Sequence, residues 1–329
     1  MKRILFFALC LAFSLLISIK PACAYDLALR HDVFTPAFQL VWNDFKEFVS
    51  LKRVNFRGID PRVAYVLNAN KFTADDVSEN SYYKVAAPKS YELKAKIQRE
   101  IFEKFGEKSK ILDEIDWAPK GIDEYIFYSM LIKNVEFPSE FDILESRAFS
   151  NSKETYKFFG VKKDADDFSK QVKPLFYLNP FDYAVSIETK SGDRVILYRT
   201  NSPQNVYDIY SQMDAKTNKH LRVGESDELI IPFISVNERI SYDALCNRKI
   251  IGTKYVIAKA IDDIEFNLDN KGAKLRNEAA MHIMKMSMPI PGKGTIYDFS
   301  KPFVLFMVEK DKNLPYFALR INDGRFLVK

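Results

Sequence analysis

The chain has 329 residues, of which 47% are hydrophobic, 14% aromatic and 28% charged. This composition predicts a folded protein with a hydrophobic core and excludes a disordered one. The formal net charge of +5 comes without a long basic run, which argues against a nucleic-acid-binding protein.

The first 24 residues are typical of a cleavable secretory signal. Lys2 and Arg3 precede an apolar stretch from Ile4 to Ile19, and Ala22-Cys23-Ala24 offers small residues where a signal peptidase reads them. We expect cleavage after Ala24, which leaves a mature chain of residues 25–329 with a net charge of +2. No other apolar run is long enough to span a membrane. The sequence therefore predicts a secreted or periplasmic protein.

Helical patterns are concentrated in the first part of the mature chain. Thr35-Pro36 predicts a helix start, and apolar residues follow at helical spacing as far as Phe48. Ser90 is expected to begin a second helix that Gly106 ends. Between them, the short apolar stretch from Val63 to Lys71 is interpreted as a strand.

Strand patterns dominate the rest of the chain. Tyr125 to Ile132 is a continuous apolar run, typical of a strand covered on both faces. Two alternating segments separated by Lys190-Ser191-Gly192-Asp193 predict a hairpin, and Ser202-Pro203 starts a short helix after it. Further strands are expected at 229–236, 255–261, 264–268, 303–308 and 316–321. With helices early and large, mostly antiparallel sheets late, the sequence predicts one α+β domain over residues 25–329.

No group of residues forms a recognisable active site. Ser81-Tyr82-Tyr83-Lys84 matches the Ser-x-x-Lys of penicillin-binding enzymes, but the Lys-Thr-Gly partner is absent. The pair Asp262-Asp263 has the position of a solvated strand end. Cys246, the one cysteine after the signal, is expected to be buried rather than reactive. The three histidines lack metal-ligand spacing: His31, His220 and His282. We therefore expect no catalytic residue, no metal and no cofactor.

The last third of the chain resembles the C-terminal part of the serpin superfamily. A strand that begins near Asp262 runs into a turn at Gly272, a long segment covers residues 273–294, and a hairpin that begins at Lys301-Pro302-Phe303 closes the chain. Serpins have a strand that leads into an exposed reactive loop, followed by a closing hairpin with a basic-or-His-Pro-Phe start. The resemblance implies a serpin-like fold with an exposed loop near the C-terminus.

The resemblance is weaker upstream. Residues 97–115 are similar to the helix that crosses the main sheet of serpins, and residues 125–141 to the central strand that follows, where Lys133 and Phe141 keep the family pattern. The mature chain is shorter than most serpins, and Glu136 stands near the position of the family's tryptophan. Two other departures lie in the last strands: Ala318 replaces a glycine and Asp323 a proline.

The resemblance also implies a partner, which is a serine or cysteine protease. Serpin inhibitors are not enzymes: they trap a protease when cleavage lets the loop enter the main sheet as an extra strand. The implied hinge of this loop consists of Gly272, Ala273, Leu275, Asn277 and Ala279. The implied scissile residues are Lys285, Met286 and Met288.

Two interpretations of the loop stay open. In a strand, Ala273, Leu275, Asn277 and Ala279 share one face and the charged residues Lys274, Arg276 and Glu278 the other, which allows insertion. Leu275 is bulky, however, and a buried Asn277 is costly. In a helix, Leu275, Ala279, Ile283 and Met286 form an apolar stripe, which favours a non-inhibitory binding or structural protein. We expect a monomer in both cases.

Overall fold

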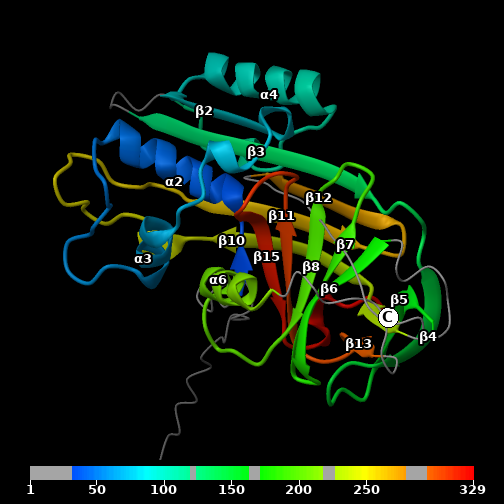
Figure 1. Cartoon of the computed structure of the whole chain (residues 1–329). Helices are drawn as coiled ribbons and strands as arrows, with labels where there is room; N and C mark the ends of the chain where they lie inside the picture. Colours follow the sequence, from blue (N-terminus) through cyan, green and yellow to red (C-terminus); the bar gives the residue numbers. More distant parts are fainter. Residues whose placement is uncertain (1–31, 119–123, 163–170, 218–226, 279–294) are drawn as a thin grey trace, which may run out of the picture.

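The computed structural model describes residues 32–118, 124–162, 171–217, 227–278 and 295–329 (Figure 1). The predicted signal peptide and the three histidines lie outside the described residues. Within those residues the chain forms four α-helices and three β-sheets. The helices are α2 (Pro36–Phe48), α3 (Arg62–Ala69), α4 (Tyr91–Phe105) and α6 (Val206–Lys216).

We call the five-stranded sheet the main sheet. All neighbouring strands in it are antiparallel. Their order is β10 (Ile234–Ser241), β11 (Ile261–Leu268), β12 (Gly272–Glu278), β3 (Tyr125–Glu136) and β2 (Tyr82–Pro88).

The six-stranded sheet, called here the inner sheet, is also antiparallel throughout. Every residue of its central strands β14 and β15 is buried. The strand order is β1 (Val33–Phe34), β15 (Pro315–Ile321), β14 (Phe303–Val308), β8 (Arg194–Arg199), β7 (Asp182–Glu188) and β6 (Val172–Asn179).

A third sheet, called the small sheet, lies near the C-terminus (Figure 1). Its one parallel pair is β13 with β9, and the other pairs are antiparallel. The strand order is β13 (Ile296–Asp298), β9 (Glu228–Pro232), β5 (Thr155–Val161) and β4 (Asp142–Ala148).

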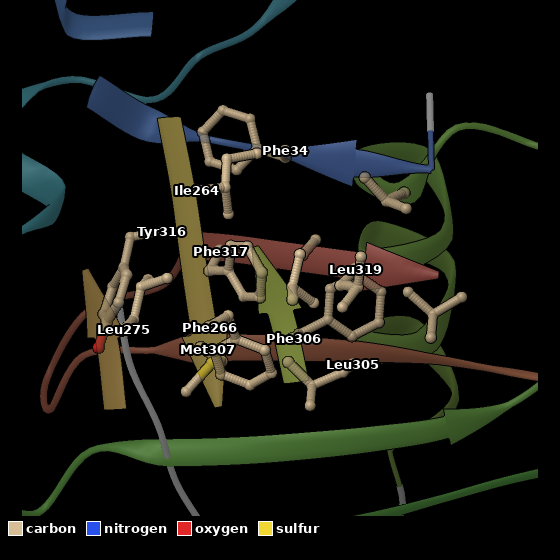
Figure 2. Close-up of a cluster of buried hydrophobic side chains, with 14 of the residues drawn as sticks. Phe34, Ile264, Phe266, Leu275, Leu305, Phe306, Met307, Tyr316, Phe317 and Leu319 are labelled. Carbon is tan, nitrogen blue, oxygen red and sulfur yellow. The ribbon is translucent and has the colours of Figure 1, made fainter. Parts of the chain in front are cut away.

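The hydrophobic core lies between the main sheet and the inner sheet. Figure 2 shows Ile264 and Phe266 of β11 beside Phe317 of β15, and the rings of Phe266 and Phe317 are 4.9 Å apart. Burial of such large apolar side chains is the dominant favourable term in folding, at about 1.5–3 kcal/mol for each one. The core therefore fixes how the main sheet sits on the inner sheet.

Helices α2 and α4 pack against the main sheet, and the sequence contains the residues that start and end α4. Ser90 accepts a hydrogen bond from Leu93 N–H at the start of α4, and Gly106 ends the helix in the left-handed conformation with φ of 70°. The hydroxyl of Tyr83 on β2 donates to Glu100 of α4 over 2.9 Å. Helix α2 instead contacts β3 from the core side, through the rings of Phe45 and Phe127. These two predicted helices are confirmed, and the third, predicted to start at Ser202-Pro203, begins at Val206 as α6.

Several predicted boundaries are wrong. Residues 62–69 form helix α3 and not the predicted strand; Val63, Ala64 and Leu67 are buried, which is a helical spacing. The predicted strand at 229–236 is two strands, because Phe233 separates β9 from β10. Residues 255–260 precede β11 without joining it. The α+β class, the hairpin β7–β8 and the closing hairpin β14–β15 are confirmed.

None of the helices in the described parts of the chain has both the length and the apolar character needed to cross a membrane.

Candidate functional site

The segment predicted to be a loop hinge is a strand of the main sheet. Strand β12 lies between β11 and β3 and pairs antiparallel with both. Leu275 is opposite Phe266 on one side and Lys133 on the other. Both edges of β12 are therefore hydrogen-bonded, and the strand occupies the centre of the sheet.

A tight turn brings the chain from β11 into β12. The Asp269 carboxylate accepts hydrogen bonds from Lys271 N–H over 2.8 Å and Gly272 N–H over 3.1 Å. A Cβ atom added at Gly272 would lie 2.1 Å from the carbonyl oxygen of Val135 on β3. Glycine is thus required because the two backbones approach too closely for any side chain.

The inner face of β12 is apolar. Ala273 is 3% exposed and Leu275 is fully buried. Figure 2 shows Leu275 beside Tyr316 in the core between the two sheets. The predicted alternation is correct for the residues whose side chains are described, because Lys274 points away from this core and is exposed.

The outer face of β12 contains a buried cation that the sequence does not reveal. Arg276 is 6% exposed. Its guanidinium lies 3.4 Å from the carboxylate of Glu107, 3.6 Å from that of Glu265 and 3.9 Å from that of Asp263. It also donates a hydrogen bond to the carbonyl oxygen of Lys108. The segment after α4 therefore covers this face and supplies part of the opposing charge.

Two further cations belong to the same outer-face cluster. Arg239 of β10 donates to Asp263 over 2.9 Å and contacts Glu114, and Lys110 pairs with Glu265. Together with Arg276 these groups join β10, β11, β12 and residues 107–114 into one ionic network. Networks of this kind are more effective than isolated surface pairs, because each charge has several partners.

A second charge cluster lies under the inner face. The Lys133 ammonium on β3 is 2.7 Å from both the Asp193 and the Glu309 carboxylates, and it lies 5.1 Å from the centre of the Tyr316 ring. Burial raises the pKa of Asp193, and the Lys133 charge opposes that shift. The cluster links the main sheet to the β7–β8 turn and to the end of β14.

The pair Asp262-Asp263 is not a solvated strand end. Asp262 is fully buried and Asp263 is 5% exposed. Thr35, just before α2, donates its hydroxyl to Asp262 over 2.6 Å, so it does not cap the helix as its position suggests. Burial and the nearby Asp262 carboxylate raise the pKa of Tyr242, whose hydroxyl is 3.4 Å from Asp262. Polar groups inside the molecule here bond one another.

The predicted site residues fall into two groups. Gly272, Ala273, Leu275 and Asn277 belong to β12. The helical interpretation is wrong for Leu275, because this residue is in the sheet. The remaining ones lie outside the described residues: Ala279, Lys285, Met286 and Met288.

The other motifs do not assemble an active site in the described residues. The Lys84 ammonium pairs with Asp44 at 2.5 Å, and Ser81 is buried in a short 3₁₀ turn. Cys246 is half-buried, its thiol donates to the Tyr242 carbonyl over 3.6 Å, and burial raises its thiol pKa. Among the described residues, no three metal-ligating side chains form a cluster.

The signals of the two charge clusters were weak in the sequence. Lys133 stood out only through the serpin resemblance, and Arg276 was predicted only to share the charged face of a strand with Lys274 and Glu278. Their partners are up to 176 residues distant in the chain, as with Lys133 and Glu309. A local sequence pattern does not predict ion pairs between residues so far apart in the chain.

No protein-family model and no curated protein sequence matches the chain. Solved structures do match it. Mouse protein Z-dependent protease inhibitor is similar with a TM-score of 0.51 and 10% identity, over 90% of this chain and 92% of that one. Serpin48 of the insect Tenebrio molitor has a TM-score of 0.45 and 11% identity, over 91% and 95% of the two chains. Thyroxine-binding globulin has a TM-score of 0.47 and 10% identity, over 90% and 98%.

The order of the strands and the fold comparison agree. The closing hairpin β14–β15, which the resemblance in sequence implied, is present and lies in the inner sheet. The resemblance implied an exposed loop directly after β11, but residues 272–278 form β12 at the centre of the main sheet. The match to the mouse inhibitor covers nearly the whole of both chains. The chain has a serpin-like fold.

Proposed function

We propose that the protein is an exported, monomeric, single-domain protease inhibitor of the serpin type, in which a serine or cysteine protease cuts the part of the loop 273–294 that follows β12. It is not itself an enzyme in this proposal. The observation that carries it is the seating of β12 between β11 and β3. Trapping by insertion requires a main sheet that can accept the loop as an added strand, and the position of β12 supports this requirement.

Strand β3 is longer than the part of it that pairs with β12. Strand β12 pairs with Met130–Glu136, so residues 125–129 of β3 extend beyond it. If the same register continued after cleavage, residues 279–283 would lie opposite residues 129–125. The proposed scissile residues Lys285, Met286 and Met288 all come after that stretch, so a cut at any of them leaves it free to insert.

The direct test uses the mature protein with trypsin-like, chymotrypsin-like and elastase-like serine proteases and a papain-like cysteine protease. We expect a covalent complex that survives SDS with at least one of them. A triple variant, Lys285→Gly, Met286→Gly and Met288→Gly, is the matched control and should lose that complex. The proposal is contradicted if all four enzymes cleave the wild-type chain without forming a complex.

One observation favours a second candidate, a non-inhibitory binding protein on the same scaffold. Leu275 is already buried and Arg276 already has its carboxylates while the chain is intact. Part of the stabilisation that insertion supplies is therefore present before any cleavage. The melting temperatures of intact and nicked protein distinguish the two candidates: an inhibitor gains thermal stability on nicking, and a non-inhibitory protein does not.

A further inference from the structure

Two segments at one end of the molecule concentrate its positive charge. Residues 46–65 and 243–259 hold nine lysine and arginine residues and three acidic residues, a net charge of +6, whereas the whole chain has +5. Figure 1 shows these segments around α3, at the end of the molecule away from the small sheet and the C-terminus. We call this region the basic pole. The remainder of the protein is, in sum, slightly acidic.

Backbone pairing holds the two segments side by side. Arg57 N–H donates to the Lys249 carbonyl over 2.8 Å, and Ile251 N–H donates to the Asn55 carbonyl over 2.9 Å. Phe56 and Ile250 form the bridge between them and are buried. Because side chains alternate along extended backbone, their neighbours Arg57, Lys249 and Ile251 point outward together.

Exposed apolar side chains are interleaved with these cations. Ile59 is 87% exposed, Tyr65 is 64% exposed and Ile251 is 57% exposed. The Arg53 guanidinium lies 6.0 Å from the centre of the Tyr65 ring, and Arg248 donates to the Ile59 carbonyl. Single exposed apolar side chains are common, but two isoleucines and a tyrosine within one basic region favour an interaction site.

Three cations of the pole have no ion-pair partner among the described residues. In the parts of the chain that the structure describes, Arg53, Arg57 and Lys249 form no ion pair. Lys259, at the edge of the pole, does pair with Glu114 at 3.4 Å. The charge of these three cations is therefore available for an external partner.

We propose that the basic pole binds the surface of an anionic lipid bilayer. Each lysine or arginine near such a surface contributes about 1 kcal/mol, and aliphatic and aromatic side chains add binding by entering the interfacial layer. A soluble polyanion would engage the cations equally well but leaves Ile59 and Ile251 without a role. The contact is peripheral, and the small sheet at the other end of the molecule stays free.

The test measures co-sedimentation of the mature protein with vesicles. We expect it to bind vesicles of phosphatidylglycerol mixed with phosphatidylcholine, not vesicles of phosphatidylcholine alone, and to dissociate as salt rises from 0.05 to 0.5 M. The variant Arg57→Glu with Lys249→Glu should bind at least about tenfold more weakly. The matched control is Lys153→Glu with Lys157→Glu, two exposed residues at the small sheet, which changes the net charge equally and should bind as the wild type does.

A second variant tests the apolar part. Ile59→Ser with Ile251→Ser keeps every charge and should weaken vesicle binding several-fold, whereas its retention on immobilised heparin should not change. Melting curves of all variants verify that they fold. The proposal is overturned by equal binding to neutral vesicles, by equal losses in the pole and control variants, or by retention on heparin without vesicle binding, which would indicate a soluble polyanion instead.

Discussion

The two faces of β12 bury their side chains by different means. On the inner face Leu275 fills a space among aromatic residues, and on the outer face Arg276 is surrounded by carboxylates and a carbonyl oxygen. An apolar contact is non-directional and depends on volume, whereas a buried cation depends on partners at the right positions. The strand thus fits the main sheet through shape on one side and charge on the other.

This difference teaches how specific the site is for its strand. Many apolar residues of similar volume can replace a leucine in a core with small losses. A slot lined by Glu107, Asp263 and Glu265 accepts a cation and disfavours an apolar or acidic side chain at the same place. We infer that the outer face determines which segment fits, and that the inner face supplies much of the free energy that holds it.

The largest effect is expected for Lys133→Met, under the inner face. The change leaves Asp193 and Glu309 buried beside each other without a cation, which costs about 3–5 kcal/mol of the free energy of unfolding at pH 7. The loss should shrink toward pH 5. Burial already raises the pKa of Asp193, and removal of the lysine raises it further, so the folded state takes up a proton before the unfolded state does.

Urea unfolding at the two pH values measures this loss. Adding Asp193→Asn and Glu309→Gln to the lysine variant should restore most of the stability, because no charge is then left buried. A loss below about 1 kcal/mol at pH 7 would contradict this expectation, since it would show that the core side of the main sheet tolerates buried carboxylates without a cation.

The second effect concerns the apolar contact itself. Leu275→Ala should lower the free energy of unfolding by about 3 kcal/mol, from lost burial and the cavity that remains. Leu275→Met is the control and should cost less than about 1.5 kcal/mol. Denaturant midpoints give both values. If Leu275→Ala proves neutral, β12 does not occupy the sheet in the intact protein in solution.

The smallest effect is expected on the outer face. Arg276→Ala removes the cation but leaves Asp263 next to Arg239 and Glu265 next to Lys110, so we expect a loss of about 2 kcal/mol. The neighbouring exposed residue provides the control, since Lys274→Ala should change stability by less than about 0.5 kcal/mol. Amide exchange along β12 adds a local readout: it should accelerate in the arginine variant only. Equal behaviour of the two variants would remove the distinction between a buried and a solvated cation.

The sequence predicted best those elements that carry their own signals. Helix α4 has a capping serine, an apolar stripe and a terminal glycine within one short stretch, and the β7–β8 hairpin has its turn residues between alternating segments. The sequence of α3 also carries a helical signal, although this segment was predicted to be a strand. Tyr65 is exposed between the buried Ala64 and Leu67, a spacing that fits a helix and not a strand.

The candidate site was harder to predict, because its chemistry comes from distant parts of the chain. The alternation along residues 272–276 was visible, and so was the possibility that Ala273 and Leu275 face inward. That Arg276 is buried follows only from Glu107 after α4 and from the acids of β11, which a local pattern does not reveal. Buried Asp262 was likewise missed, since its partner Thr35 lies at the start of α2.

Gly272 gives experimental control over the sheet. The carbonyl oxygen of Val135 on β3 lies so close to Gly272 that only a hydrogen atom fits in place of a side chain. A single added carbon atom, as in Gly272→Ala, alters no charge and no residue from 273 to 294. The added methyl group would clash with the Val135 carbonyl oxygen whenever β12 lies in the main sheet. The substitution should therefore favour a form of the protein in which β12 is outside the sheet.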